Sequence, residues 1–166
     1  MQLSKNYKLK ASTNLMIIIL VILLDQCTKL FVLNHVGLGN SAPLFPEIAK
    51  LTVVQNTGGA FSILKNYPIF FKLIGLINLL VFSYIVFCPT VKVNDLIKTG
   101  GALIFGGTVG NLADRFLRGG VIDFIDLQLF QFAVFNLADV CVDIGVALIL
   151  IGVFSKRISP DNKVDG

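Results

Sequence analysis

Four apolar runs, separated by polar connections, define the hydropathy pattern of this chain. A helix that crosses the hydrocarbon core of a bilayer needs about 20 mostly apolar residues. Windows that meet this requirement are Leu15–Leu33, Tyr67–Pro89, Leu96–Leu117 and Phe135–Phe154. We therefore predict an all-α membrane protein with four transmembrane helices, which together form a single integral membrane domain over residues 1–166.

The third window is unusually rich in glycine. Small residues let helix backbones approach closely inside a membrane, where the hydrophobic effect does not drive helix association. This composition predicts close helix contacts at Gly100, Gly101, Gly106, Gly107 and Gly110.

The pattern changes between the first two windows, over residues 36–66. Pro43 and Pro46 disfavour helix, and the β-branched stretch after Lys50 leads to Asn56 and a glycine pair. We predict a small β-rich element outside the membrane at about 36–66, whose glycines could let backbone approach an extended peptide. An ordinary hairpin with Asn-Thr-Gly-Gly as its turn remains an alternative interpretation of the same residues.

Composition supports the membrane assignment. Hydrophobic residues make up 55% of the chain and charged residues 14%, and the mean hydropathy is +0.81. These values are too apolar for an ordinary soluble domain. We expect the first apolar run to be retained rather than cleaved, because no small-residue cleavage site follows it and Asp25 and Lys29 interrupt it.

The basic residues predict the orientation of the helices. The net charge of +4 lacks the basic stripe that nucleic-acid binding requires, so we expect no nucleic-acid partner. Cytoplasmic connections carry an excess of Lys and Arg. With these windows, one side of the membrane receives Lys5, Lys8, Lys10, Lys92, Lys98, Lys156, Arg157 and Lys163, and the other receives Lys50, Lys65 and Arg118. Both termini are therefore predicted to be cytoplasmic.

The three cysteines indicate no redox framework or thiol catalysis. Cys27, Cys88 and Cys141 lie within or at the edge of the windows, and an odd count forms no obvious set of disulfides. The single His35 lies at a different helix end from Cys88 and Cys141, so it is not placed to activate them as nucleophiles. We expect the cysteines to be buried packing residues.

Carboxylates lie beside segments apolar enough for lipid. A charged side chain near the bilayer centre costs about 2.5–3.5 kcal/mol on insertion scales, and intramembrane ionisable groups therefore usually mark function. The predicted orientation brings polar residues of several segments to the outer membrane face. Within each predicted helix, these polar residues are three or four positions apart, which places them on one face of the helix. Helix by helix, they are Asp25 and Lys29; Asn111, Asp114 and Arg115; and Asn136, Asp139 and Asp143.

Asp123 and Asp139 come from different segments and are the candidate chemical centre. Two such carboxyl groups can share one proton, so that one activates water as a base while the other hydrogen-bonds a scissile carbonyl. Three alternatives stay open at this point: a hard cation such as Mg²⁺ held by the carboxylates, a proton relay in a small transporter, and purely structural pairing of the charges.

Five motifs in order resemble those of the lipoprotein signal peptidases, the type II signal peptidases of bacteria. They are DQCTK at 25–29, QNTGGAF at 55–61, GNLADR at 110–115, VIDFID at 121–126 and FNLAD at 135–139. The resemblance covers nearly the whole chain. It implies an aspartic endopeptidase, multi-pass in the bacterial cytoplasmic (inner) membrane, that cuts before a diacylglyceryl-modified cysteine at the extracytoplasmic side.

The resemblance also assigns roles to residues. The positions that match the family's catalytic aspartates are Asp123 and Asp139. Polar residues around the substrate correspond to Asn56, Asn111, Arg115 and Asn136, and a supporting polar site corresponds to Asp25, Lys29, Gly58 and Asp114. No metal or organic cofactor is implied. The implied partners are lipid-modified prolipoproteins, membrane lipid and globomycin-type inhibitors, and we expect a monomer.

The chain departs from the family pattern at Gly59, Cys27, Val140 and Asp143. Of these, Asp143 adds a carboxyl group beside the candidate pair, where a small or hydroxyl residue is typical. Four helical residues rise about 6 Å, so we expect Asp143 to be buried one turn deeper than Asp139. There it would be a hydrogen-bond donor that orients Asp139 or a neighbouring helix, and not the catalytic partner.

Overall fold

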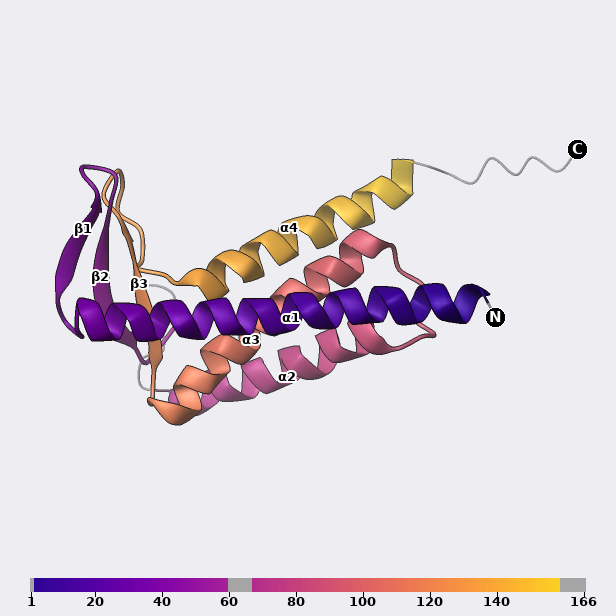
Figure 1. The fold of residues 1–166 in the computed structure, drawn as a ribbon, viewed down its shortest axis with the longest axis horizontal. Coiled ribbons are helices and arrows are strands. Elements are labelled where there is room, and N and C mark those ends of the chain that lie inside the picture. The colour runs from indigo at the N-terminus through magenta and orange to yellow at the C-terminus, as the bar shows by residue number, and fades with distance from the viewer. Residues whose placement is uncertain (1, 60–66, 159–166) are drawn as a thin grey trace, which may run out of the picture.

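The computed structural model describes residues 2–59 and 67–158, and within them it forms four helices and three strands (Figure 1). The elements in chain order are α1 (Gln2–His35), β1 (Ser41–Phe45), β2 (Ala49–Asn56), α2 (Pro68–Phe87), α3 (Asp95–Leu117), β3 (Val121–Leu127) and α4 (Leu137–Ile158). The sheet lies at one end of the helices. The start of α1, the α2–α3 connection and the end of α4 lie at the other end (Figure 1).

Each helix overlaps one of the predicted windows. The ends of the helices differ from the ends of the windows for local reasons. Helix α1 begins at Gln2, well before the first window, because the polar residues that precede Leu15 include no proline or glycine. Helix α2 ends at Phe87, and Cys88 is extended at φ −75° and ψ 122°. Such a conformation is expected directly before Pro89, because proline disfavours the α region for the residue that precedes it.

In the part of the chain that the structure describes, three helical segments are long and apolar enough to cross a membrane: Lys10–His35, Pro68–Phe87 and Leu137–Ser155. They leave large apolar side chains exposed on their outer surfaces, such as Leu80 at 73%. Exposure of this kind is unfavourable in water but suits lipid. Helix α3 is outside this group because its polar residues and glycines lower its hydropathy.

Helix α3 packs against all three other helices, and its glycines make the contacts close. A Cβ atom added to Gly100 would lie 2.5 Å from the backbone oxygen of Gly145 on α4, and one added to Gly107 would lie 2.6 Å from that of Ala138. A Cβ at Gly110 would collide with a carboxylate oxygen of Asp25 on α1. The predicted small-residue contacts are confirmed at these positions.

The three strands form one antiparallel sheet in the order β1-β2-β3. The prediction of a β-rich element at 36–66 was incomplete, because β3 comes from the connection between α3 and α4. The described hairpin turns at 46–48, between β1 and β2, and not at Asn56–Gly59. Residues 60–66 of the predicted element, together with the topology markers Lys65 and Lys163, lie outside the described residues.

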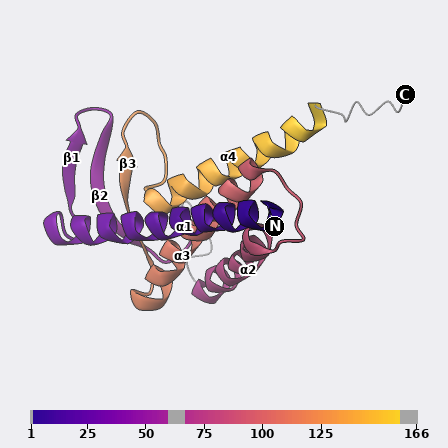
Figure 2. The same ribbon diagram turned by 45° about the vertical axis from the view of Figure 1, so that its right-hand side comes forward.

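The alternation of strand β3 directs Asp123 away from the apolar core. Ile122 and Phe124 pack with Val32 of α1 and Val53 of β2 in a buried cluster. Successive side chains of a strand point to opposite faces, so Asp123 projects from the other face. Both ribbon views show the end of α1 extending alongside the sheet (Figures 1 and 2). The buried cluster packs between this part of α1 and the sheet.

The expectation that all three cysteines are buried was wrong for Cys27. This residue is exposed on α1, whereas Cys88 and Cys141 are partly buried. Cys27 follows the polar residues Asp25 and Gln26, and the helical turn places it on a different side from buried Asp25.

Candidate active site

A buried ion cluster lies at the end of the helices nearest the sheet. The Lys29 ammonium nitrogen is 2.9 Å from Asp25 Oδ2 and 2.8 Å from Asp114 Oδ2, and all three side chains are 0% exposed. The Asp25–Lys29 pair has the i,i+4 spacing noted in the sequence, whereas the contact with Asp114 joins α1 to α3. Two carboxylates around one ammonium compensate charges that would be costly to bury alone.

The same two carboxylates also fix backbone in other elements. Asp25 Oδ1 accepts a hydrogen bond of 3.2 Å from the backbone N–H of Ala138, at the start of α4. Asp114 Oδ2 accepts one of 3.2 Å from the N–H of Ile122 in β3, and its Oδ1 is bonded by Arg118. The cluster therefore ties α1, α3, α4 and β3 together at one point.

Two asparagine amides connect this cluster to the candidate carboxyl pair. Lys29 donates to Asn111 Oδ1 at 3.0 Å, and Asn111 Nδ2 donates to Asp139 Oδ1 at 2.8 Å. Asn136 Nδ2 donates both to Asn111 Oδ1 at 3.1 Å and to Asp123 Oδ1 at 2.7 Å. Asp123 and Asp139 are thus held by two neighbouring amides that are themselves hydrogen-bonded.

Asp139 is oriented by the way in which α4 begins. The backbone N–H of Asn136 donates to Asp139 Oδ2 at 3.2 Å, and the N–H of Asp139 donates to Asn136 Oδ1 at 3.0 Å. This reciprocal arrangement is a capping box, in which the residue before the helix and the third residue of the helix satisfy each other's backbone groups. The cap that starts α4 also positions the carboxylate.

The loop after β2 holds Asp123 from the other side. Asn56 Nδ2 donates to Asp123 Oδ2 at 3.0 Å, while Asn56 Oδ1 accepts from the N–H of Gly58 at 2.9 Å. The second contact is an Asx turn, which fixes the asparagine side chain against its own backbone. Arg115 lies nearby, where its guanidinium donates to the carbonyl of Gly58 at 3.5 Å and to that of Asn111 at 3.3 Å.

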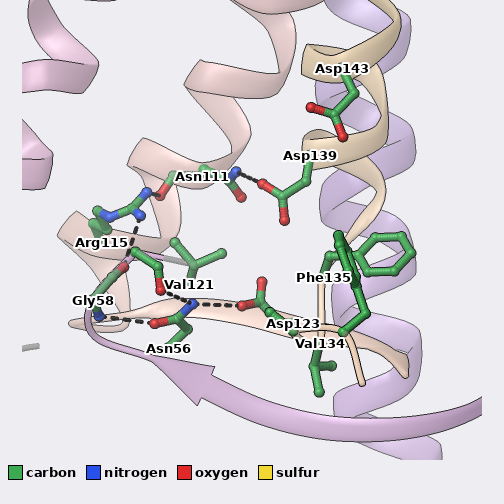
Figure 3. A pocket seen from close by; sticks show the side chains of 13 residues that line it. Asn56, Gly58, Asn111, Arg115, Val121, Asp123, Val134, Phe135, Asp139 and Asp143 are labelled. Atoms are coloured by element: carbon green, nitrogen blue, oxygen red, sulfur yellow. Dashed lines mark hydrogen bonds between the residues drawn. The ribbon is translucent and has the colours of Figure 1, made fainter. Parts of the chain in front are cut away.

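The two carboxyl groups face one cavity of about 390 Å³ (Figure 3). Its size is within the range of small-ligand sites in proteins. Polar groups of β2, α3, β3 and α4 line one part of it, and an apolar wall lines the rest. The lining residues are Asn56, Gly58, Gly59, Asn111, Arg115, Val121, Asp123, Phe132, Ala133, Val134, Phe135, Asp139 and Asp143.

The structure separates the predicted site residues into two layers. The cavity is lined by Asn56, Gly58, Asn111, Arg115, Asp123 and Asp139, and beneath it lie Asp25, Lys29, Asp114 and Asn136. Asn136, expected near the substrate, is 0% exposed and donates a hydrogen bond to Asp123. The sequence analysis missed the apolar wall of Phe132, Val134 and Phe135. Its only signal was an apolar run between the two aspartate motifs.

The expectation that Asp143 is buried and orients Asp139 or a neighbouring helix was wrong. Its side chain is exposed and not buried, and it lines the cavity. Among the described residues it has no hydrogen bond to Asp139 or to a neighbouring helix. Helical rise alone predicted its depth along α4 but not that the cavity opens at that level.

Burial is the main influence on the acidity of Asp123, which lies on β3 outside the helices. Loss of hydration raises the pKa of its carboxyl to about 6, and the nearby charge of Asp139 acts in the same direction. Hydrogen bonds from Asn56 and Asn136 oppose this rise in pKa because they favour the ionised form. A carboxyl group with a pKa near 6 can hold a proton close to neutral pH.

Comparison with known proteins first defines the class. The fold is similar to that of a bacterial membrane enzyme determined by the in meso method at 2.3 Å resolution, with a TM-score of 0.80 and 32% identity over 93% of both chains. A second bacterial membrane enzyme, at 1.9 Å resolution, gives a TM-score of 0.77 and 34% identity over 86% of this chain and 92% of that one. The chain therefore has the fold of a bacterial membrane enzyme.

Sequence comparison then defines the family. Residues 17–155 match the family model described as signal peptidase (SPase) II. The lipoprotein signal peptidase of Staphylococcus carnosus is 39% identical over 153 residues, which cover 89% of this chain and 94% of the relative. That of Nostoc punctiforme is 38% identical over 143 residues, or 86% and 89%. The chain belongs to the signal peptidase II family of membrane-embedded bacterial peptidases, which confirms the family resemblance.

The buried ion cluster leads to a stability prediction. Lys29→Met should lower the free energy of unfolding by about 3–5 kcal/mol, because it leaves the buried carboxylate of Asp25 without a cation and leaves Asp114 with Arg118 as its cation. Lys50→Met is the matched control. Lys50 is 3.4 Å from Asp126 with 40% of its side chain exposed, so its loss should cost less than about 1 kcal/mol. Unfolding of both variants in the same detergent, followed by helical circular dichroism, measures the difference; equal losses would contradict the role given to Lys29.

Proposed function

We propose that this protein is an aspartic endopeptidase that removes signal peptides from lipid-modified prolipoproteins, cutting directly before the diacylglyceryl-modified cysteine. The family and the curated lipoprotein signal peptidases similar to it support the substrate class. The observation that carries the proposed mechanism is the placement of Asp123 and Asp139, two carboxyl groups from separate elements that face one cavity. Each is held by an amide of the same hydrogen-bonded pair.

The contacts of these carboxyl groups favour acid–base chemistry over the alternatives. Amide N–H groups donate to both oxygens of Asp123 and to one oxygen of Asp139, and a backbone N–H donates to the other. Because N–H donors already occupy lone pairs of these carboxylate oxygens, the arrangement does not favour a metal ion bound to the same oxygens. It also does not favour a structural ion pair, because the donors are uncharged. Structural charge pairing is instead concentrated in the cluster around Lys29, one layer below.

In the proposed reaction, the carboxylate of Asp139 takes a proton from a water molecule between the two groups. The hydroxide oxygen bonds to the scissile carbonyl carbon, while Asp123 donates its proton to the carbonyl oxygen. The tetrahedral intermediate then collapses: the C–N bond breaks, the leaving nitrogen takes the proton from Asp139, and one hydroxyl of the intermediate returns its proton to Asp123, which restores both carboxyl groups. We assign the initial proton to Asp123 because burial raises the pKa of this carboxyl to about 6.

The remaining cavity residues are proposed to hold the substrate. Arg115 presents donors to backbone or ester carbonyls, and its planar guanidinium suits such oxygens. Asn56 lines the same space beside Asp123. The apolar wall around Phe132 and Phe135 faces the same space and suits the hydrophobic signal segment. Globomycin-type inhibitors are proposed to occupy this cavity as well, for which competition with precursor cleavage is the test. We propose that the enzyme acts as a monomer without a metal or organic cofactor.

We further propose that all four helices span the cytoplasmic membrane as a single domain, with both termini in the cytoplasm and the sheet and site outside. Helix α3 has 23 residues, or about 34 Å, which is long enough to cross the hydrocarbon core. Its low hydropathy is compatible with a spanning position because the other helices pack around it and limit its contact with lipid.

The first prediction concerns the two carboxyl groups. Asp123→Asn and Asp139→Asn should each reduce cleavage of a lipidated precursor by at least about 1,000-fold, because each removes one acid–base group. Asp126→Asn is the matched control. Asp126 belongs to the same strand as Asp123 but bonds to Thr52 and should retain cleavage. A gel-shift assay with purified protein in lipid measures all three, and near-normal cleavage by either dyad variant would refute the assignment.

The second prediction concerns pH. If Asp123 carries the required proton, kcat/KM should fall as pH rises through about 6, where this group ionises. Asn56→Leu removes a hydrogen bond that favours the ionised carboxylate, so the pKa should rise and the falling limb should move to higher pH. Thr52→Ala, which alters a contact of Asp126, should not move it. A limb that moves to lower pH in Asn56→Leu would assign the proton elsewhere.

The third prediction concerns orientation. In a background with the three native cysteines replaced by serine, Lys50→Cys on β2 should react with a membrane-impermeant thiol reagent in intact spheroplasts. Lys92→Cys, in the exposed α2–α3 connection, should react only after the membrane is opened. The reverse labelling pattern would place the site on the cytoplasmic side.

A further inference from the structure

Asp143 is the one polar side chain of the described cavity lining for which no described residue supplies a hydrogen bond or an ion pair. Asn56, Asn111, Arg115, Asp123 and Asp139 each have such partners. Asp143 is exposed on α4 and lines the same cavity. Figure 3 shows its carboxyl group projecting from the helix on the same side as that of Asp139. Its hydrogen-bonding capacity is therefore available to a molecule in the cavity.

The position of Asp143 along α4 indicates which residue of a bound substrate would lie beside it. It lies four residues after Asp139, which is about 6 Å of helix rise, in the direction away from the sheet. An extended peptide advances about 3.3 Å per residue. A substrate whose scissile bond lies at Asp139 and whose signal segment descends along α4 therefore places its second residue before that bond beside Asp143.

The chemistry of this position discriminates between side chains. A carboxyl group accepts hydrogen bonds, while the apolar residues of the cavity lining, Val134 and Phe135 among them, have no side-chain partner for a polar group. A hydroxyl in this part of the cavity would gain a partner at Asp143, and a methyl group of similar size would gain none. The difference between the two is the contribution of one hydrogen bond.

We propose that Asp143 is a specificity-determining residue, which favours precursors with serine or threonine at the second residue before the scissile bond over those with alanine or valine. This inference rests on the proposed function, because it uses the register of a signal segment cut between Asp123 and Asp139. It assigns Asp143 no part in the chemical step, since the amides that hold the two catalytic carboxyl groups do not reach it.

The test compares matched lipidated precursors that differ only at this residue: alanine with serine, and valine with threonine. The measured quantity is the ratio of kcat/KM for the hydroxyl precursor to that for its apolar counterpart, with purified protein in lipid. We expect a ratio of about 5 for the unsubstituted enzyme, the size of one typical net hydrogen bond. Asp143→Leu should reduce the ratio to about 1, and Asp143→Asn should keep it above 1 because an amide oxygen still accepts.

The control is Ile144→Ala, which alters an exposed neighbour that does not line the cavity and should leave the ratio unchanged. Equal ratios in the unsubstituted enzyme and in Asp143→Leu would overturn this inference while leaving the proposed function intact. Failure of the unsubstituted enzyme to cut any of the four precursors would overturn the proposed function, and this inference with it.

Discussion

The buried ammonium of Lys29 is the contact on which the rest of the site depends. Burying ions costs several kcal/mol each, and this is offset only by close partners with good geometry. Here Asp25 and Asp114 provide those partners at 2.9 and 2.8 Å. The same carboxylates accept hydrogen bonds from backbone N–H groups at the start of α4 and in β3. The contacts that compensate the buried charge of Lys29 therefore also fix the positions of these two elements.

The two amides between the ion cluster and the candidate carboxyl pair are neutral, and this has a chemical consequence. Asn111 and Asn136 connect the ion cluster to the two carboxyl groups proposed as catalytic, without placing a cation in contact with them. A cation in direct contact would favour ionisation of both groups. Amides fix geometry with weaker bias toward the charged form, so burial can keep the pKa of Asp123 near 6. The proposed reaction needs one carboxyl group protonated and one ionised, which such an environment permits.

The sequence predicted the four helices well because the length and polarity of an apolar run reflect the thickness of a bilayer directly. The sequence also indicated which polar residues lie close together. This inference needs only the helix orientation, predicted from the lysine distribution, and the spacing of polar residues within each helix. Strand β3 was not predicted, because only seven residues form it. The buried face of the strand, with Ile122 and Phe124, is defined by contacts with Val32 and Val53, which are distant in the sequence.

Other features depend on the tertiary structure in the same way. The burial of Asn136 follows from three elements that meet around its amide, and the apolar wall is formed by a connection with no periodic pattern. Asp143 was misplaced because helical rise gives depth along α4 but does not show where the surface of the bundle opens. In each case the missing information was which surface another segment covers.

The central claim is that Asp123 and Asp139 act as one unit, and it is tested most directly by non-additivity. Single-turnover cleavage of a lipidated precursor would be measured by mass spectrometry for Asp123→Asn, Asp139→Asn and the double variant in one preparation. Groups that share one step lose nearly everything when either is removed, so the double variant should be no slower than the slower single variant. Losses that multiply in the double variant would show that the two carboxyl groups act independently, which would contradict the account.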